Sequence, residues 1–321
     1  MTMQFRDIAA QAASAGVIGA DDILALRQAG WADGRIDPEE AEALFAANER
    51  LSEPSPQWSD FFVEALSTFV VNTVEPHGYV DEAMGEELVA RIDRDGRVDS
   101  LAELELLVKV LEISLSAPAA LKTYALKQLE EAVLTGEGPT REGALDAKGI
   151  NAVEADLLRR TIFAVGGDRP AAVSKAEAEM LFRLKDAVLY EVNAPEWGKL
   201  FVQGVANYLL GFETSDPLSR ERAAELERFM DSEGAGIGGF LARMMKSDVE
   251  SGAGEAFGSL LDMSSSSPGS EADGTDSAPA MSDAGELWLL EKIDADEELD
   301  ELEKALLAFI AEETGTPLER S

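Results

Sequence analysis

The sequence lacks cysteine and contains a single histidine, His77, among its 321 residues. The absence of cysteine excludes disulfides and thiolate metal sites, and one histidine excludes most imidazole-based metal binding and acid–base catalysis. Basic residues are also few, because 27 Lys and Arg face 63 Asp and Glu and leave a formal net charge of −36. Nucleic acids and anionic membranes are bound through clustered cations. We therefore expect no nucleic-acid partner.

Long hydrophobic runs are also missing. No stretch approaches the about 20 apolar residues that a membrane-spanning helix needs, and residues 1–16 lack the apolar run of a secretory signal. We therefore expect no transmembrane segment and a cytoplasmic location. Catalytic and nucleotide-binding motifs such as Gly-x-Ser-x-Gly, the P-loop and the dinucleotide fingerprint are absent as well, so we expect a protein that is not an enzyme. A hydrolase whose carboxylates meet only in the fold remains an alternative.

The sequence does contain an internal repeat. The pentapeptide Asp-Gly-Arg-Ile-Asp at residues 33–37 returns at residues 95–99 as Asp-Gly-Arg-Val-Asp. A third copy is clearest in its last part, where Trp197 and Phe201 align with Trp58 and Phe62. We infer three repeats of about 62 residues, near 16–76, 77–138 and 149–211.

Each repeat has the pattern of three helices. The last helix shows it best, because the apolar residues of 58–70 fall at spacings of three, four, seven and eight along one helical face. Strand patterns are nearly absent. We predict an all-α fold of tandem three-helix units packed as a helical array, in which Trp58 and Trp197 lie in the core and do not form a ligand cage.

Composition divides the chain into four parts. Residues 1–138 form two tandem units, and residues 139–250 form the third unit with extra helices at Leu218–Met230 and Ile237–Val249. Residues 251–285 read as a flexible acidic linker rich in Ser, Gly and Pro. Residues 286–321 regain a helical pattern.

The C-terminal part resembles an incomplete fourth repeat. Residues 289–313 match 88–112, which covers the first two helices of a repeat and lacks the third. We predict a C-terminal helical hairpin after the linker. An incomplete unit cannot bury its own apolar face, so we expect these helices to dock on the protein's own repeats or on a partner.

The recurrent acidic motif, Asp-Gly-x-Ile/Val-Asp-x-x-Glu, carries a candidate metal site. It resembles the second half of an EF-hand loop and the loop and helix start of TerB-like tellurite-resistance domains, a helical family with acidic, metal-linked members. The EF-hand resemblance implies Ca²⁺ as a possible ligand, although Ala29, Arg91 and Lys292 stand where a calcium loop begins with a carboxylate. The best-equipped loops contain Asp93, Asp95, Asp99 and Glu103, and Asp294, Asp296, Asp300 and Glu303.

The same residues also fit a structural interpretation. An Asp or Ser at the helix N-cap and a Glu three residues later form a capping box, in which each side chain accepts from the other residue's backbone amide. The four pairs are Asp37 with Glu40, Ser100 with Glu103, Ser174 with Glu177, and Asp300 with Glu303.

Two functions follow from these patterns. The first is a non-enzymatic helical interaction or scaffold protein with a tethered C-terminal docking helix pair, no cofactor and a protein partner. The alternative is a divalent-cation sensor or buffer, with calcium as its ligand. The 18 acids and 3 bases of residues 251–321 would steer the tethered helices toward a basic surface.

Overall fold

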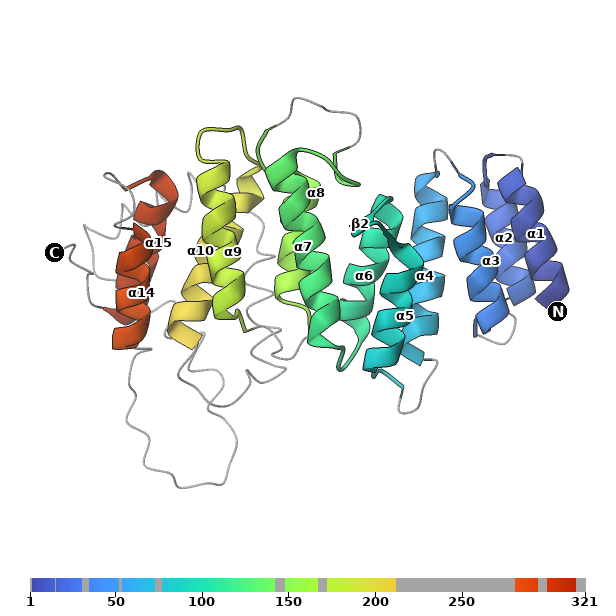
Figure 1. Cartoon of the computed structure of the whole chain (residues 1–321), viewed down its shortest axis with the longest axis horizontal. Helices are drawn as coiled ribbons and strands as arrows, with labels where there is room; N and C mark the ends of the chain where they lie inside the picture. The colour runs from blue at the N-terminus through green and yellow to red at the C-terminus, as the bar shows by residue number, and fades with distance from the viewer. Residues whose placement is uncertain are drawn as a thin grey trace, which may run out of the picture. The chain divides into compact units, whose positions relative to one another are not determined.

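A computed structural model of the chain describes residues 2–14, 16–30, 35–51, 54–72, 77–141, 148–166, 172–211, 281–293 and 299–315. Within these ranges, 73% of the residues lie in twelve helices, and the sheet has two short strands (Figure 1). The prediction of an all-α protein is confirmed. No helix of the described part is long and apolar enough to cross a membrane.

The described helices follow one another along the chain, mostly with short connections. The first are α1 (Thr2–Ser14), α2 (Ala20–Gly30), α3 (Pro38–Asn48) and α4 (Pro56–Asn72), followed by α5 (Glu82–Ile92), α6 (Leu101–Ile113) and α7 (Ala119–Thr135). The later ones are α8 (Ala152–Ile162), α9 (Lys175–Ala187), α10 (Pro195–Gly211), α14 (Asp283–Ile293) and α15 (Glu301–Thr314). Between α5 and α6, strands β1 (Asp93–Arg94) and β2 (Arg97–Val98) pair antiparallel.

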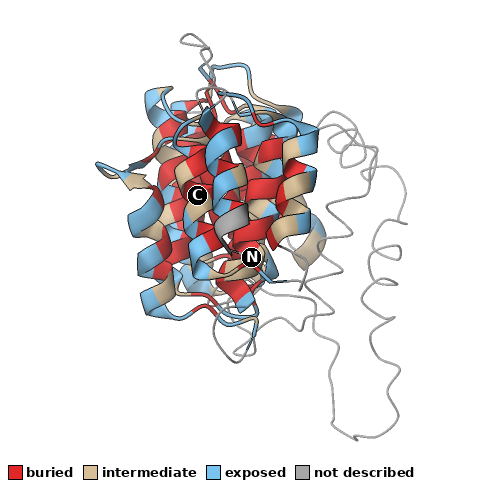
Figure 2. Cartoon of the chain, turned by 90° about the vertical axis from the view of Figure 1, so that its right-hand side faces the viewer, coloured by how far each residue is buried: buried red, intermediate tan, exposed pale blue. Residues whose placement is uncertain are grey.

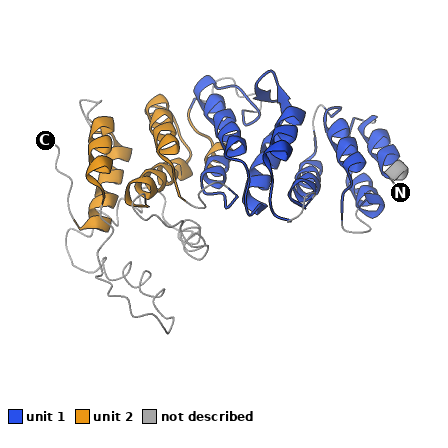
Figure 3. Cartoon of the chain, turned by 60° about the horizontal axis from the view of Figure 1, so that its bottom comes forward, with its two compact units in different colours: residues 1–148, 156–171 blue, residues 149–155, 172–321 orange. Residues whose placement is uncertain are grey.

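The chain divides into two compact units (Figure 3). Compact unit 1 comprises residues 1–148 and 156–171, and compact unit 2 comprises residues 149–155 and 172–321. The boundary passes through α8, whose first turn belongs to compact unit 2.

All four predicted capping boxes are present. The N-caps Asp37, Ser100, Ser174 and Asp300 each accept from the backbone N–H of the Glu three residues later, and that Glu accepts from the N-cap backbone N–H. These boxes begin α3, α6, α9 and α15. Since the first turn of a helix has free N–H donors, the local sequence alone is enough to fix these starts.

The predicted aromatic stripes lie in the core. Trp58 and Phe62 in α4 and Trp197 and Phe201 in α10 are at most 1% exposed. Helices such as α2 and α5 carry exposed residues on one side and buried residues on the other (Figure 2), whereas α6 and α10 are buried or intermediate over almost their whole length. Phe69, at the end of the first stripe, is only half-buried. The prediction that Trp58 and Trp197 pack in the core is therefore confirmed.

Three features differ from the sequence pattern. Helix α1 precedes the first predicted repeat and buries Phe5 completely. The acidic loop after α5 contains the hairpin β1–β2, with Asp95 and Gly96 at positive φ. Helix α14 begins inside the predicted linker, because the Ser282 hydroxyl accepts from the Gly285 amide and starts the helix. The predicted helices at 218–230 and 237–249, and the linker before residue 281, lie outside the described residues.

Candidate docking site of the C-terminal helices

Within compact unit 2, α14 contacts α9 and α10 through one tryptophan. Trp288 is 7% exposed, and its ring meets the ring of Phe182 in α9 edge to face at a centroid distance of 5.5 Å. The ring of Tyr208 in α10 lies 4.9 Å from it in the same geometry. Edge-to-face aromatic pairs add stabilisation to that of the area they bury. An aromatic contact therefore joins the C-terminal part to the helices before residue 211.

The start of α15 is held by a buried cation. Lys185 in α9 is 1% exposed, and its Nζ lies 2.6 Å from Asp300 Oδ2 and 2.9 Å from Glu303 Oε1. A third carboxylate, of Asp186, lies 2.8 Å from the same nitrogen. The side chain of Glu303 is fully buried, so this is an ion pair away from solvent. The capping box of α15 therefore also receives the Lys185 ammonium.

Electrostatics keep this lysine charged. Burial alone would lower the pKa of Lys185, but its hydrogen bonds to Asp186, Asp300 and Glu303 outweigh burial and raise that pKa above its usual value. An ammonium donates three hydrogen bonds and accepts none. The Lys185 ammonium can therefore bind the three carboxylates at once.

An open groove of about 650 Å³ lies beside this cluster. It is bordered by Lys185, by Trp197 and by residues 299–302 at the start of α15. The indole Nε1 of Trp197 is buried and has no hydrogen-bond partner in the part of the chain that the structure describes. A larger groove, of about 1510 Å³, occupies the corresponding place in compact unit 1, where it is bordered by Asn48 and by residues 99–103 at the start of α6.

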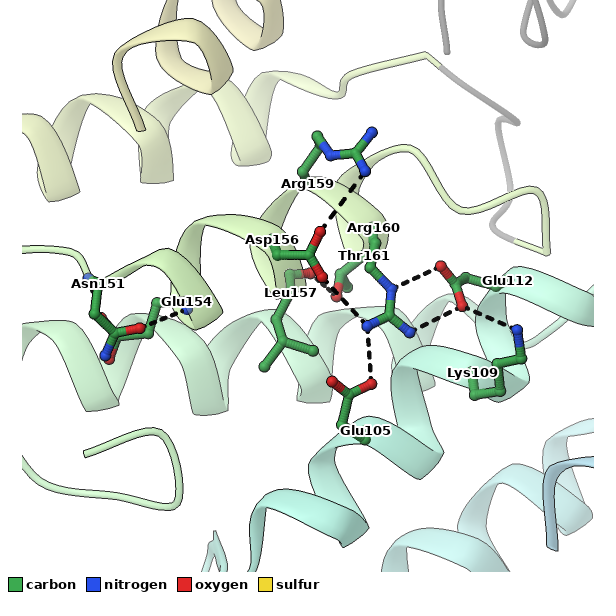
Figure 4. Close-up of polar contacts among 10 residues, drawn as sticks. All are labelled: Glu105, Lys109, Glu112, Asn151, Glu154, Asp156, Leu157, Arg159, Arg160 and Thr161. Atoms are coloured by element: carbon green, nitrogen blue, oxygen red, sulfur yellow. Dashed lines mark hydrogen bonds and ion pairs between the residues drawn. The ribbon is translucent and has the colours of Figure 1, made fainter. Parts of the chain in front are cut away.

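Compact unit 1 contains a different polar contact between helices, centred on Arg160 of α8 (Figure 4). Its guanidinium binds both oxygens of Glu112 at 2.8 and 3.0 Å, and it binds Glu105 at 2.8 Å. Asp156, one turn earlier in α8, lies 3.4 Å away. The hydrogen bonds to Glu112 raise the pKa of Arg160, and they lower the pKa of Glu112 although its burial acts in the opposite direction. This network joins α8 to α6.

Two of the four acids of the first predicted metal loop, Asp93 and Glu103, make hydrogen bonds within the fold. Asp93 Oδ1 accepts from the Gly96 amide at 2.8 Å, and Oδ2 accepts from the Tyr124 hydroxyl at 2.7 Å. These two bonds, the Gly96 bond first, lower the pKa of Asp93. Glu103 is 6% exposed and accepts from Ser100, and burial raises its pKa in spite of those bonds.

The remaining predicted ligands are more scattered. Asp95 and Asp99 are exposed to solvent. Asp294 and Asp296 lie outside the described residues, whereas Asp300 and Glu303 lie in the Lys185 cluster. Among the described residues, no group of three or more acidic or histidine side chains is arranged to hold a metal ion.

Sequence reasoning missed Lys185, Arg160 and Trp288 as interface residues. The first two look like ordinary charged helix residues, since their partners lie far away in the chain: Lys185 meets Glu303, 118 residues later, and Arg160 meets Glu105, 55 residues earlier. One signal was available for Trp288, because a tryptophan inside a short acidic tail has no core of its own to enter.

The chain was compared with models of protein families, with curated proteins and with solved structures. None of the three comparisons finds a match.

Proposed function

We propose that this protein is a non-enzymatic helical scaffold whose tandem repeats bind a protein partner and whose C-terminal helices are a tethered docking element. The Lys185 cluster is the observation on which this proposal rests. A lysine that is 1% exposed holds two carboxylates of the α15 capping box, although the whole of residues 212–280 lies between α10 and the C-terminal helices in the sequence. The C-terminal helices are therefore a cover that the chain supplies to its own third repeat.

The repeat organisation is supported by matching helix lengths. The first helices of the three repeats, α2, α5 and α8, each span 11 residues. The third helices, α4, α7 and α10, each span 17 residues. The second helix of each repeat, and α15 in the incomplete fourth, begins at a capping box. Stacked units of this kind expose extended surfaces suited to protein binding.

The docking of the C-terminal helices is supported by the chemistry of their contacts. Removing them would expose Phe182 and Tyr208 and leave the Lys185 charge without Asp300 and Glu303. Exposed apolar surface next to a charge is typical of a protein-binding site. A tether raises the local concentration of the helices at this surface to the millimolar range, so a partner must compete with them.

Affinity capture with two chains tests this proposal. Full-length protein and a chain that ends at residue 280 are used as baits in an extract of the source cell. We expect the shortened chain to gain or lose partners, because its α9–α10 surface is uncovered. A chain that lacks only residues 316–321 is the control and should behave like the full-length protein. Identical stability and identical partners for all three chains would contradict the docking proposal.

A further inference from the structure

The first repeat carries an acidic pair that the next repeat neutralises with arginines. Glu42 lies in α3, and Glu49, its C-cap residue, follows two helical turns later on the same face. Arg91 of α5 pairs with Glu42, and Arg94, just after α5, pairs with Glu49 at 2.6 Å. These pairs join two successive repeats.

The second repeat carries the same pair. When α3 and α6 are aligned at their N-caps, Asp37 and Ser100, Glu105 falls on Glu42 and Glu112 falls on Glu49. Arg160 of α8 lies between Glu105 and Glu112 and binds each at 2.8 Å (Figure 4). At two junctions, therefore, an arginine at or just after the first helix of the next repeat binds the acidic pair on the second helix of the repeat before it.

The third repeat has the acidic pair, but α14 brings no arginine to it. The same alignment, with Ser174 as the N-cap of α9, places Glu179 and Asp186 at these two positions. The only cation of α14 is Lys292, for which the described part of the chain offers no ion pair. Glu179 pairs with Lys175 at 3.9 Å and Asp186 pairs with Lys185 at 2.8 Å, both lysines of α9 itself. The C-terminal helices thus pack on α9 without supplying an arginine to this pair, whose side chains are 36% and 59% exposed.

Two buried indole N–H groups at the same junction have no acceptor among the described residues. In the first repeat, Trp58 Nε1 donates at 3.1 Å to Oδ1 of Asn48, the last residue of α3. Lys185 occupies the corresponding position of α9 and cannot accept, so Trp197 Nε1 is buried with no acceptor among the described residues. The Nε1 of Trp288 in α14 is likewise buried, and the described ranges offer it no acceptor. Buried donors without acceptors weaken the structure that contains them.

We propose that the α9 face around Glu179 and Asp186 is a docking surface for an arginine-bearing helix of a partner protein, and that α14–α15 is the cover which this helix displaces. The inference rests on the proposed scaffold function and names the chemistry of the partner. The guanidinium would lie between the two carboxylates as Arg160 lies between Glu105 and Glu112. A planar guanidinium can bind two carboxylates at once, and an ammonium matches them less well.

A substitution in the full-length chain tests whether Glu179 and Asp186, which we call the arginine socket, bind an arginine. Lys292→Arg places a guanidinium on α14, at the position that Arg91 has in the repeat alignment. We expect amide hydrogen exchange in residues 283–293 to slow by about tenfold. The effect should vanish when Glu179→Gln is added, a change that leaves Asp186 in the Lys185 cluster. Glu191→Gln, which neutralises an exposed acid nearby, is the charge-matched control and should leave it intact.

A peptide tests the displacement. The probe is a lactam-stapled helix of residues 282–293 that carries Lys292→Arg, added to the full-length protein at about 1 mM, the order of the local concentration that a tether gives. We expect faster exchange in α14 and α15, and a smaller effect from the same peptide with lysine. An equal acceleration of amide exchange by the two peptides, or an acceleration that persists in the Glu179→Gln variant, would overturn the inference.

The proposed function can fail separately. If Lys185→Met leaves exchange in α15 unchanged, the docking proposal itself is wrong. If Lys185→Met releases α15 while Lys292→Arg has no effect on α14, the docking proposal stands and the arginine socket is refuted. Circular dichroism of each variant checks that the helices remain folded.

Discussion

The ammonium of Lys185 and the carboxylate of Asp300 lie 2.6 Å apart, although 115 residues separate them in the chain. This contact joins α9 to the start of α15 inside compact unit 2. Its strength depends on burial, because exposed ion pairs contribute little to stability and buried ones become costly when one partner is removed. The lysine side chain is 1% exposed and that of Asp300 is 10% exposed.

Lys185→Met should therefore destabilise compact unit 2 by about 3–5 kcal/mol, because Glu303 would remain buried and charged without its cation. Urea unfolding followed by tryptophan fluorescence measures this, since Trp197 and Trp288 both lie in this unit. Lys175→Met is the matched control on the same helix. Lys175 is exposed, and its replacement should change the free energy of unfolding by less than about 0.5 kcal/mol. A similar loss for both variants would show that the cluster has no special role.

The capping boxes allow a smaller and cleaner test. Ser174→Ala removes the acceptor for the Glu177 amide at the start of α9 and should cost about 1 kcal/mol. Ser116→Ala is the control, because Ser116 is exposed and its hydroxyl has no partner among the described residues. Thermal melts of the two variants make the comparison. An unchanged melting temperature for Ser174→Ala would mean that packing alone determines the start of α9.

The capping boxes and the Lys185 cluster show which contacts can be predicted from sequence and which cannot. A capping box involves residues three apart, so the pairs that begin α3, α6, α9 and α15 were visible in the sequence. The aromatic stripe of α4 was visible for the same reason. The partners of Lys185 and Arg160 depend on which helices become neighbours, and no local pattern contains that information. Most of the helical fold could thus be predicted, whereas the contacts of the candidate site could not.

The acidic loop illustrates the same limit at one residue. Asp93 was predicted as a metal ligand from its neighbours in the sequence. In the fold, its second oxygen accepts from Tyr124, 31 residues later in α7. Tyr124 is half-buried, and its hydroxyl donates to Asp93. A pattern of residue types does not reveal which acids are already engaged.

Arg160 predicts that arginine and lysine are not interchangeable at the α6–α8 contact. Arg160→Lys keeps the charge but loses the paired bonds to Glu112, and we expect a loss of about 1–2 kcal/mol. Arg97→Lys is the control, since Arg97 is 64% exposed and lies 3.5 Å from Glu137. It should cost less than about 0.5 kcal/mol in the same urea titration. Equal costs would indicate that charge alone matters at position 160.

The lowered pKa of Asp93 gives a pH dependence. A carboxyl whose pKa is lower in the folded than in the unfolded state stabilises the fold above its unfolded pKa, and this stabilisation is lost as the pH falls through the folded value. Asp93→Asn should therefore destabilise the protein at pH 7, and the difference from the wild type should shrink below about pH 4. Unfolding titrations across this range measure the difference. A difference that stays constant down to about pH 2 would contradict the assignment.

The calcium hypothesis has a test of its own, independent of the predictions above. It predicts that about 1 mM Ca²⁺ raises the melting temperature, since a ligand that binds only the folded state stabilises it. Calcium would compete with the Tyr124 hydroxyl for Oδ2 of Asp93, so Tyr124→Phe, which removes that hydrogen bond, should increase the shift. Asp93→Asn with Asp95→Asn should abolish it. The control, Glu86→Gln with Glu87→Gln, removes two exposed acids of α5 and should leave it unchanged. If the wild type and Tyr124→Phe show no calcium-dependent shift, this loop is not a calcium site and its acids serve the fold alone.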